Sequence, residues 1–213
     1  MPRLLYIYDA LCGWCYGFSP VISRFQAEHP TQFSYEVLSG GMMTGARVQP
    51  VSVSMSYIEQ AYKTVEERTG VQFGEAYLTN LLRPGTYLSN STPPGQAMSL
   101  FKATQLGATP SRQIAFAAAL QNALYHDGID LNVWENYGPL VEPFGLDPAE
   151  FVAHADDEAI RQQTRQEFGL VAQMQIGGFP AVIVDHNDKL FLVAQGYVPY
   201  ETLLANVNRA MQQ

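Results

Sequence analysis

The sequence predicts an α/β fold in which a β-α-β unit at the N-terminus and a β-β-α unit at the C-terminus are separated by a helical insertion. Three observations support this prediction. A continuous apolar run, Leu4–Tyr8, opens the chain and is followed by apolar residues at helical spacing. From about residue 50 the pattern stays helical for over a hundred residues. Near residue 181 it returns to short strands and a last helix.

The N-terminal unit is expected to begin with a strand at Leu4–Tyr8 that is buried on both faces. A helix is expected from Gly13 onward, with Pro20 placed to kink this helix rather than to start it. A second strand is predicted at Phe33–Leu38. The segment SGGMM, Ser39–Met43, is predicted to be a turn whose paired glycines permit positive φ angles.

Cap residues and helical periodicity define the middle of the chain. One helix is expected to end at Gly70, and another is expected to begin with Ser111 as its N-cap. In the segment DPAEF, Asp147 is the predicted cap, with Pro148 at the first helical position and Glu150 three residues after the cap. The helices predicted here are Tyr57–Thr69, Phe73–Leu82, Ala97–Leu106, Ser111–Tyr125, a short one after Asp147, and Asp157–Gln173, with a loop at Arg83–Gly95.

The C-terminal unit is predicted to contain two strands, Ala181–Val184 and Leu190–Ala194, and a final amphipathic helix, Tyr200–Met211. The strands at either end of the chain are too few to form a stable sheet alone, so the two ends are expected to pair in one domain. We therefore assign residues 1–48 and 170–213 to one α/β domain and residues 49–169 to an inserted helical domain.

The composition excludes several classes of function. The chain has 213 residues, of which 47% are apolar, and 20 acidic against 12 basic residues give a net charge of −8. This charge repels nucleic acid, and no Lys/Arg cluster offsets it locally. The N-terminal apolar run is too short for a secretory signal, and no run reaches the length of a membrane span. We therefore expect a cytoplasmic protein, in which disulfides are transient and catalytic or redox-sensing.

Both cysteines of the chain lie in a C-x-x-C pair, Cys12 and Cys15, where the first strand gives way to the first helix. In the first turn of a helix, residues three apart lie on one face and are close enough for a disulfide to form and break. The unpaired N–H groups and the positive end of the helix dipole favour a thiolate at Cys12, which makes Cys12 the expected nucleophile. Cys15, one turn inside the helix, is the expected resolving thiol.

Two other interpretations of the cysteines are possible. A zinc site needs three or four ligands, but there is no second C-x-x-C and the four histidines stand alone, so no metal is expected. Two buried cysteines that only fill space remain an alternative, because a free cysteine is often a small core residue.

The segment LCGWCYGF, which follows a strand, resembles the active-site segment of the DsbA-like branch of the thioredoxin superfamily. Tyr16, Phe18 and Pro20 match residues of that family after the second cysteine. The helical middle resembles the insertion of DsbA-like proteins, particularly the cytosolic FrnE-like group, in the segments ALYHDGIDLN and FGLDPAEF. The resemblance covers nearly the whole chain and implies a thioredoxin-like fold interrupted by a helical insertion.

The segment GGFPAVIV, Gly177–Val184, resembles the part of the superfamily that carries a cis-proline. The resemblance implies that Pro180 packs beside Cys12 and Cys15 and leaves the backbone of Phe179 free to pair with a substrate. It also implies that Gly13 and Trp14 contact substrate. A trans-proline that simply starts a strand is the alternative, because an X-Pro bond is more often trans.

The sequence departs from the family at three places. Gly13 and Trp14 stand where DsbA has Pro-His, so no imidazole assists the Cys12 thiolate. Tyr6 stands where thioredoxin and DsbA carry a buried acid, so proton transfer to and from Cys15 needs another group or water. Asp9 is the nearest carboxylate, but its expected role is that of a turn or helix-capping residue, and we do not count it as catalytic.

The resemblance implies a thiol-disulfide oxidoreductase that acts on protein, peptide or small-thiol disulfides through Cys12 and Cys15. No dissociable cofactor is expected, although glutathione or the thioredoxin system is a candidate redox partner. One alternative is an enzyme like the kappa-class glutathione transferases and 2-hydroxychromene-2-carboxylate isomerases, which share this architecture but do not use a resolving thiol. A second is a non-catalytic peptide-binding chaperone, whose acidic surface supplies solubility.

Overall fold

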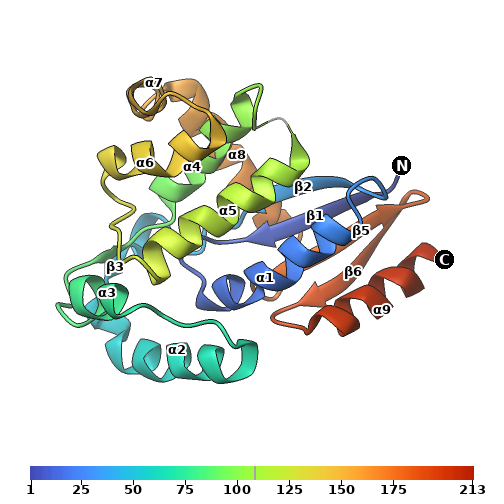
Figure 1. The fold of residues 1–213 in the computed structure, drawn as a ribbon, viewed down its shortest axis with the longest axis horizontal. Coiled ribbons are helices and arrows are strands. Elements are labelled where there is room, and N and C mark those ends of the chain that lie inside the picture. The colour runs from blue at the N-terminus through green and yellow to red at the C-terminus, as the bar shows by residue number, and fades with distance from the viewer. Residues whose placement is uncertain (108) are drawn as a thin grey trace.

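The computed structural model describes residues 1–107 and 109–213. Along the chain, a long and mainly helical region separates the strands near the N-terminus from those near the C-terminus, as the sequence predicts (Figure 1). The elements in chain order are β1 Arg3–Tyr8, α1 Gly13–Glu28, β2 Ser34–Ser39, β3 Gln49–Pro50, α2 Met55–Thr69, α3 Glu75–Tyr77, β4 Leu88–Ser89, α4 Thr92–Ala103, α5 Pro110–Tyr125, α6 Gly138–Val141, α7 Pro148–Ala153, α8 Glu158–Gln173, β5 Ala181–His186, β6 Lys189–Gln195 and α9 Tyr200–Met211.

The main sheet joins the two ends of the chain and has the strand order β2-β1-β5-β6. β1 runs parallel to β2, and β5 is antiparallel to both β1 and β6. The hairpin between β5 and β6 turns at Asn187 and Asp188, whose φ angles are 51° and 58°. Both residues are of the kinds that tolerate this left-handed conformation, which matches the right-handed twist of a hairpin. The predicted α/β fold class is therefore confirmed.

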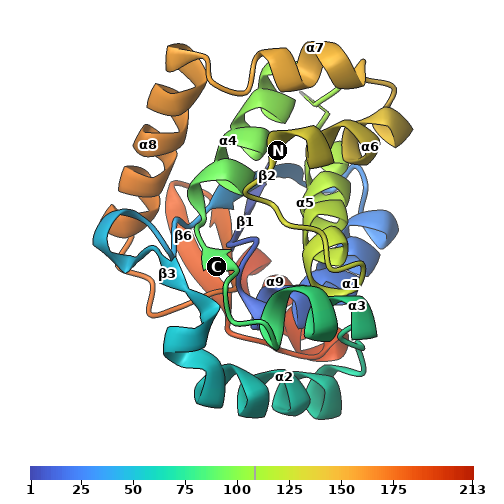
Figure 2. The ribbon, with the colours of Figure 1, turned by 90° about the vertical axis from the view of Figure 1, so that its left-hand side faces the viewer.

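Helices cover both faces of this sheet: α1 and α9 lie on one side and α8 on the other (Figure 2). Successive side chains of a strand point to opposite faces. In β1, Leu4, Tyr6 and Tyr8 belong to the larger core cluster, whereas Leu5 and Ile7 join a smaller one that includes Val171 of α8. The strand is thus buried on both faces, and this explains why its sequence is an uninterrupted apolar run rather than an alternating one.

The helical region agrees with the predictions where a local signal sets a boundary. α2 ends at Gly70, which has a left-handed φ of 80°, and the side chain of Asp147 caps α7 by accepting from the N–H of Glu150 at 2.8 Å. α1 continues through Pro20 to Glu28. None of the described helices is both long and apolar enough to cross a bilayer.

Three predictions in this region were wrong. α4 starts at Thr92, inside the predicted loop, because its two prolines fall in the first turn, where their missing N–H groups are not needed. α5 starts at Pro110, with Thr109 and not Ser111 at the N-cap position. The predicted helix Phe73–Leu82 is one α-turn, α3, followed by a π-helical turn at Leu78–Leu82.

α8 connects the helical region to the sheet, because it contacts both α4 and β2. Lys102 of α4 and Glu167 of α8 form an ion pair of 2.6 Å, with only 12% and 10% of their side-chain surfaces exposed. The second oxygen of Glu167 accepts from the N–H of Ser39, the last residue of β2, at 2.7 Å. The carboxylate therefore ties three elements together. The domain boundaries at residues 48 and 169 stay a prediction.

Removing one partner of this ion pair should destabilise the fold. Lys102→Met leaves the Glu167 carboxylate buried without its cation, and we expect this variant to lose about 3 kcal/mol of unfolding free energy. Glu167→Gln in the same background removes the uncompensated charge and keeps an oxygen for Ser39, so it should restore about half of that loss. Urea unfolding followed by circular dichroism measures both values. A double variant less stable than Lys102→Met would contradict this account.

Candidate active site

The two cysteines lie at the start of α1, as free thiols. Cys12 is the N-cap residue and has an extended backbone, and its carbonyl accepts from the N–H of Cys15 at 2.9 Å and of Tyr16 at 3.1 Å. No side chain caps this helix, and its first turn contains no acidic residue. The unpaired N–H groups and the positive end of the helix dipole are therefore left to the Cys12 thiol.

The two thiols differ in exposure. Cys12 is 7% exposed and borders a cavity, whereas Cys15 is fully buried. Burial raises the pKa of the Cys15 thiol well above its ordinary value, and the hydrogen bond and charge of Cys12 raise it further, while a backbone hydrogen bond from Asp9 opposes the shift. Cys15 thus stays a protonated thiol in contact with Cys12. This arrangement gives one cysteine that borders the cavity and a second, fully buried thiol behind it.

The segment before β5 reaches the same point from the other end of the chain. The Cys12 thiol donates to the carbonyl oxygen of Phe179 at 3.5 Å. The peptide bond between Phe179 and Pro180 is cis, and the Pro180 carbonyl accepts from the N–H of Gly196 at 2.7 Å. The structure therefore brings the Phe179 carbonyl to the Cys12 thiol, with Pro180 next to it in the chain.

The two glycines of the predicted turn at Ser39–Met43 are required for different reasons. Gly41 has a φ of 64°, a left-handed conformation that glycine adopts without strain. Gly40 does not have a positive φ; instead, a Cβ atom there would lie 2.2 Å from the ring of Phe179. The expectation of positive φ angles was therefore right for Gly41 and wrong for Gly40, which is needed for close packing against the residue that faces Cys12.

Asp9 has a larger role than the turn or cap residue that the sequence suggested. It is 2% exposed, and its carboxylate accepts from the N–H of Leu11 at 3.0 Å, the N–H of Met42 at 2.7 Å and the hydroxyl of Ser91 at 2.9 Å. Burial raises the pKa of Asp9, and these hydrogen bonds act in the opposite direction. Its backbone carbonyl also accepts from the N–H of Cys12 at 3.0 Å. Asp9 is therefore a positioning residue for the cysteine loop.

Tyr6 lies in β1 beneath the cysteine pair. Its side chain is 1% exposed, and its hydroxyl has no hydrogen-bond partner among the described residues. Burial raises the pKa of Tyr6 well above its ordinary value, and the charge of Cys15 raises it further. The group under the cysteines is thus a neutral hydroxyl, as expected from the sequence.

A cavity of about 320 Å³ borders Cys12. Gly13 and Trp14 line it, whereas Phe179 and Pro180 do not. Sequence reasoning missed most of its wall, because these residues come from segments whose meeting depends on the tertiary fold. The lining residues are Leu11, Cys12, Gly13, Trp14, Met42, Met43, Gln49, Pro50, Val51, Ser54, Tyr57, Ile58, Ala61, Tyr62, Val65, Phe73, Tyr77, Tyr87, Ser89, Leu124 and Tyr125.

The described residues contain no cluster of three or more His, Cys, Asp or Glu side chains with the geometry of a metal site. The positive helix end, the position of Cys12 beside the cavity and the buried thiol of Cys15 together suit nucleophilic attack on sulfur followed by intramolecular resolution.

Several solved structures share this fold. A candidate protein disulfide isomerase from Nitrosomonas europaea is 26% identical, with a TM-score of 0.86 and coverage of 100% of this chain and 98% of that one. The cytosolic disulfide reductase DsbM from Pseudomonas aeruginosa is 26% identical, with a TM-score of 0.79 and coverage of 98% of both chains. A second structure of DsbM, with GSH, is 25% identical, with a TM-score of 0.77 and coverage of 99% of this chain and 100% of that one.

A 2-hydroxychromene-2-carboxylate isomerase is more distant, with 11% identity, a TM-score of 0.62 and coverage of 98% of this chain and 94% of that one. This similarity shows a common fold and no more. No curated protein sequence matches the chain significantly. The DSBA-like thioredoxin domain family matches residues 4–208, which is nearly the whole chain. Together with a sheet that joins the two chain ends around a helical insertion, this match shows that the chain belongs to the DSBA-like thioredoxin domain family.

Proposed function

We propose that this chain is a thiol-disulfide oxidoreductase in which Cys12 exchanges with a substrate disulfide and Cys15 resolves the intermediate. The observation that carries the proposal is the pairing of a cysteine that borders the cavity, at an uncapped helix N-terminus, with a fully buried thiol one turn behind it. Cys12 lies at the positive end of α1, and the burial of Cys15 keeps that thiol from competing for the substrate.

The reaction begins when the Cys12 thiolate attacks one sulfur of the substrate disulfide. A bond forms between Cys12 Sγ and that sulfur, and the electron pair of the broken S–S bond leaves with the other sulfur, which takes a proton from solvent. Cys15 then loses its proton and attacks Cys12 Sγ, so that the Cys12–Cys15 disulfide forms and the second thiolate departs. The substrate gains two electrons and the protein loses two. An external thiol returns the protein to its reduced form.

The direction of reaction depends on the reduction potential of the cysteine pair relative to its surroundings. The similarity of the whole chain to a cytosolic disulfide reductase favours reduction of disulfides in the cytosol. The DsbM structure with GSH makes glutathione a reasonable first choice as an external thiol, with the thioredoxin system as the alternative donor. The substrates on this proposal are disulfides of proteins, peptides or small thiols.

Substitution of the two cysteines should separate their roles. Cys12→Ser removes the nucleophile and is expected to lower the rate of insulin-disulfide reduction by at least about a hundredfold. Cys15→Ser also stops turnover, but it should accumulate a mixed disulfide on Cys12, which intact-protein mass spectrometry detects. A transferase or isomerase would keep its activity in Cys15→Ser, and a chaperone would still suppress aggregation of a client in the double variant. The proposal would be refuted if the wild type had no redox activity and showed either the transferase or isomerase activity or the chaperone activity described here.

The second step should depend strongly on pH. Because burial raises the pKa of Cys15, its thiolate is a minor species at neutral pH. As long as the pH is below this pKa, the thiolate fraction rises about tenfold for each unit by which the pH is raised. After a mixed disulfide forms on Cys12, we expect the rate of its resolution to increase by about that factor for each unit from pH 6 to pH 8. Stopped-flow release of the second thiol measures this rate. A rate that does not change with pH would contradict this role for Cys15.

Gly40 tests the contribution of Phe179. In Gly40→Ala the new Cβ forces the Phe179 ring to move, and with it the carbonyl that faces the Cys12 thiol. We expect disulfide exchange to slow by about tenfold to a hundredfold in the folded variant. Gly169→Ala in α8 is the matched control, because its Cβ meets no atom within 4 Å, and it should react at the wild-type rate. Equal exchange rates in the two variants would remove Phe179 from the mechanism.

A further inference from the structure

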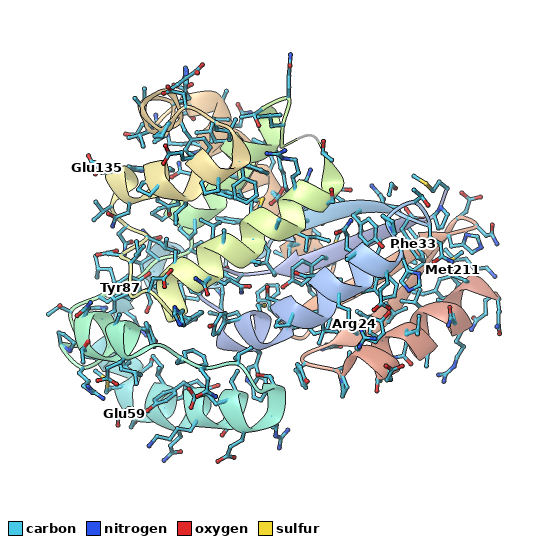
Figure 3. All side chains as sticks on the ribbon, in the orientation of Figure 1. Arg24, Phe33, Glu59, Tyr87, Glu135 and Met211 are labelled. Carbon is cyan, nitrogen blue, oxygen red and sulfur yellow. The ribbon has the colours of Figure 1, made fainter. Side chains whose placement is uncertain are left out.

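The cavity beside Cys12 is built from uncharged side chains. It reaches about 320 Å³, within the size range of small-molecule sites, and its wall includes six aromatic rings besides Trp14. Among the described residues that line it, none is Lys, Arg, His, Asp or Glu. Charged residues of α2 such as Glu59, labelled in Figure 3, are exposed and do not belong to this wall. A ligand in the cavity would therefore find no oppositely charged side chain in the wall, and the N–H groups at the start of α1 serve the Cys12 sulfur.

The absence of charged side chains in this wall discriminates between the substituents of a disulfide substrate. A substituent such as that of glutathione disulfide loses the hydration of its carboxylates on entering the cavity, and no charged side chain of the wall offsets that loss. The net charge of −8 adds a weak long-range repulsion. An uncharged apolar or aromatic group instead gains by leaving water and by packing on the rings.

Among the fully buried side-chain polar atoms of the wall, one has no hydrogen-bond partner in the part of the chain that the structure describes. Tyr87 lines the cavity, is 7% exposed, and its hydroxyl is buried without a hydrogen bond to any described residue. Figure 3 labels it where α2, α3 and the end of α5 approach one another. Burial raises the pKa of Tyr87 well above its ordinary value, so the group remains a neutral donor. A buried hydroxyl is costly to leave unpaired, and a ligand with a neutral acceptor, such as an amide carbonyl, would satisfy it.

Tyr125 differs from Tyr87, although it lines the same cavity. Its hydroxyl already donates to the carbonyl of Leu11 in the cysteine loop. The residue thus contributes its ring to the wall, and its hydroxyl holds the loop that precedes Cys12. Only Tyr87, of these two, has a hydroxyl left for a ligand.

We propose that this cavity binds the organic group of a low-molecular-weight disulfide whose substituent is uncharged and apolar or aromatic and carries a neutral hydrogen-bond acceptor for Tyr87. The inference rests on the proposed function, because it names the substrate class of the same site. Cys12 attacks the sulfur that bears this group, the group stays in the cavity while the Cys12 mixed disulfide exists, and the other half of the substrate leaves as a thiol. Cys15 then releases the bound group as the second thiol. The two electrons that the substrate gains come from the cysteine pair.

Binding is tested first without any redox step. In the Cys12→Ser, Cys15→Ser double variant, calorimetry compares N-acetyl-S-benzylcysteine amide, which is neutral, with S-benzylglutathione, which carries two carboxylates and the same ring. We expect the neutral thioether to bind at least tenfold more tightly. Equal affinities, or tighter binding of the glutathione derivative, would overturn the proposal.

Two substitutions locate the preference in the cavity. Ala61→Lys places a cation in the wall and should reduce or reverse the preference, whereas Ala61→Met adds a similar length without charge and should keep the order of affinities. Tyr87→Phe should weaken binding of the neutral thioether by about threefold to tenfold. Tyr35→Phe removes a hydroxyl that bonds to His29 outside this cavity and should leave binding unchanged. A preference that persists in Ala61→Lys and is unaffected by Tyr87→Phe would show that the ligand binds elsewhere.

A kinetic comparison distinguishes failure of this inference from failure of the proposed function. The reduced wild type is mixed with the disulfide of N-acetylcysteine benzylamide or with glutathione disulfide, and each rate is divided by that of a free thiol with the same disulfide. A normalised rate at least tenfold higher for the neutral disulfide supports the inference, and equal normalised rates overturn it. If the wild type reduces neither disulfide while the double variant keeps its binding preference, the proposed function is wrong and the specificity of the cavity stands.

Discussion

The carboxylate of Asp9 accepts hydrogen bonds from three segments that meet at the start of α1: the cysteine loop, the Gly40–Met43 loop and the residue before α4. A carboxylate taken out of water keeps its charge at reasonable cost only when such donors surround it. The same residue holds the N–H of Cys12 through its backbone carbonyl. The position of the nucleophile, the edge of the cavity and the contact with the helical region all depend on this one buried group.

The parts of the fold that follow from the sequence are those with a local cause. The β5-β6 hairpin needs residues that accept positive φ at Asn187 and Asp188, and α7 needs a cap at Asp147, so both could be located from the sequence. The two cysteines likewise lie three residues apart at a strand-to-helix junction, and this spacing alone indicates a pair of thiols that can form and break a disulfide. Each of these signals acts within a few residues of the feature it determines.

The parts that could not be predicted depend on neighbours distant in sequence. Gly40 is required because the Phe179 ring packs on it, and nothing near Gly40 in the chain indicates that. Asp9 resembles an ordinary turn residue until Ser91 and Met42 are brought beside it. The cavity is the extreme case, because its wall draws on the cysteine loop, on residues 42–62, on residues 65–89 and on the end of α5. Periodicity reports which face of a helix is buried but not which other segment it meets.

The cavity and the cysteines are supplied by different parts of the chain. The reactive sulfurs and the groups that orient them come mainly from β1, the first turn of α1 and the segment before β5, whereas much of the wall comes from α2 and the segment that follows it. In α2 only Val65 is buried, and Met55, Ile58 and Tyr62 pack against the core while partly exposed, so the other positions of the helix are less constrained by the core. Related proteins that diverge along this helix would acquire new selectivities while retaining the same sulfur chemistry, so that an ancestral catalyst needs no change in its reactive centre to serve a new metabolite.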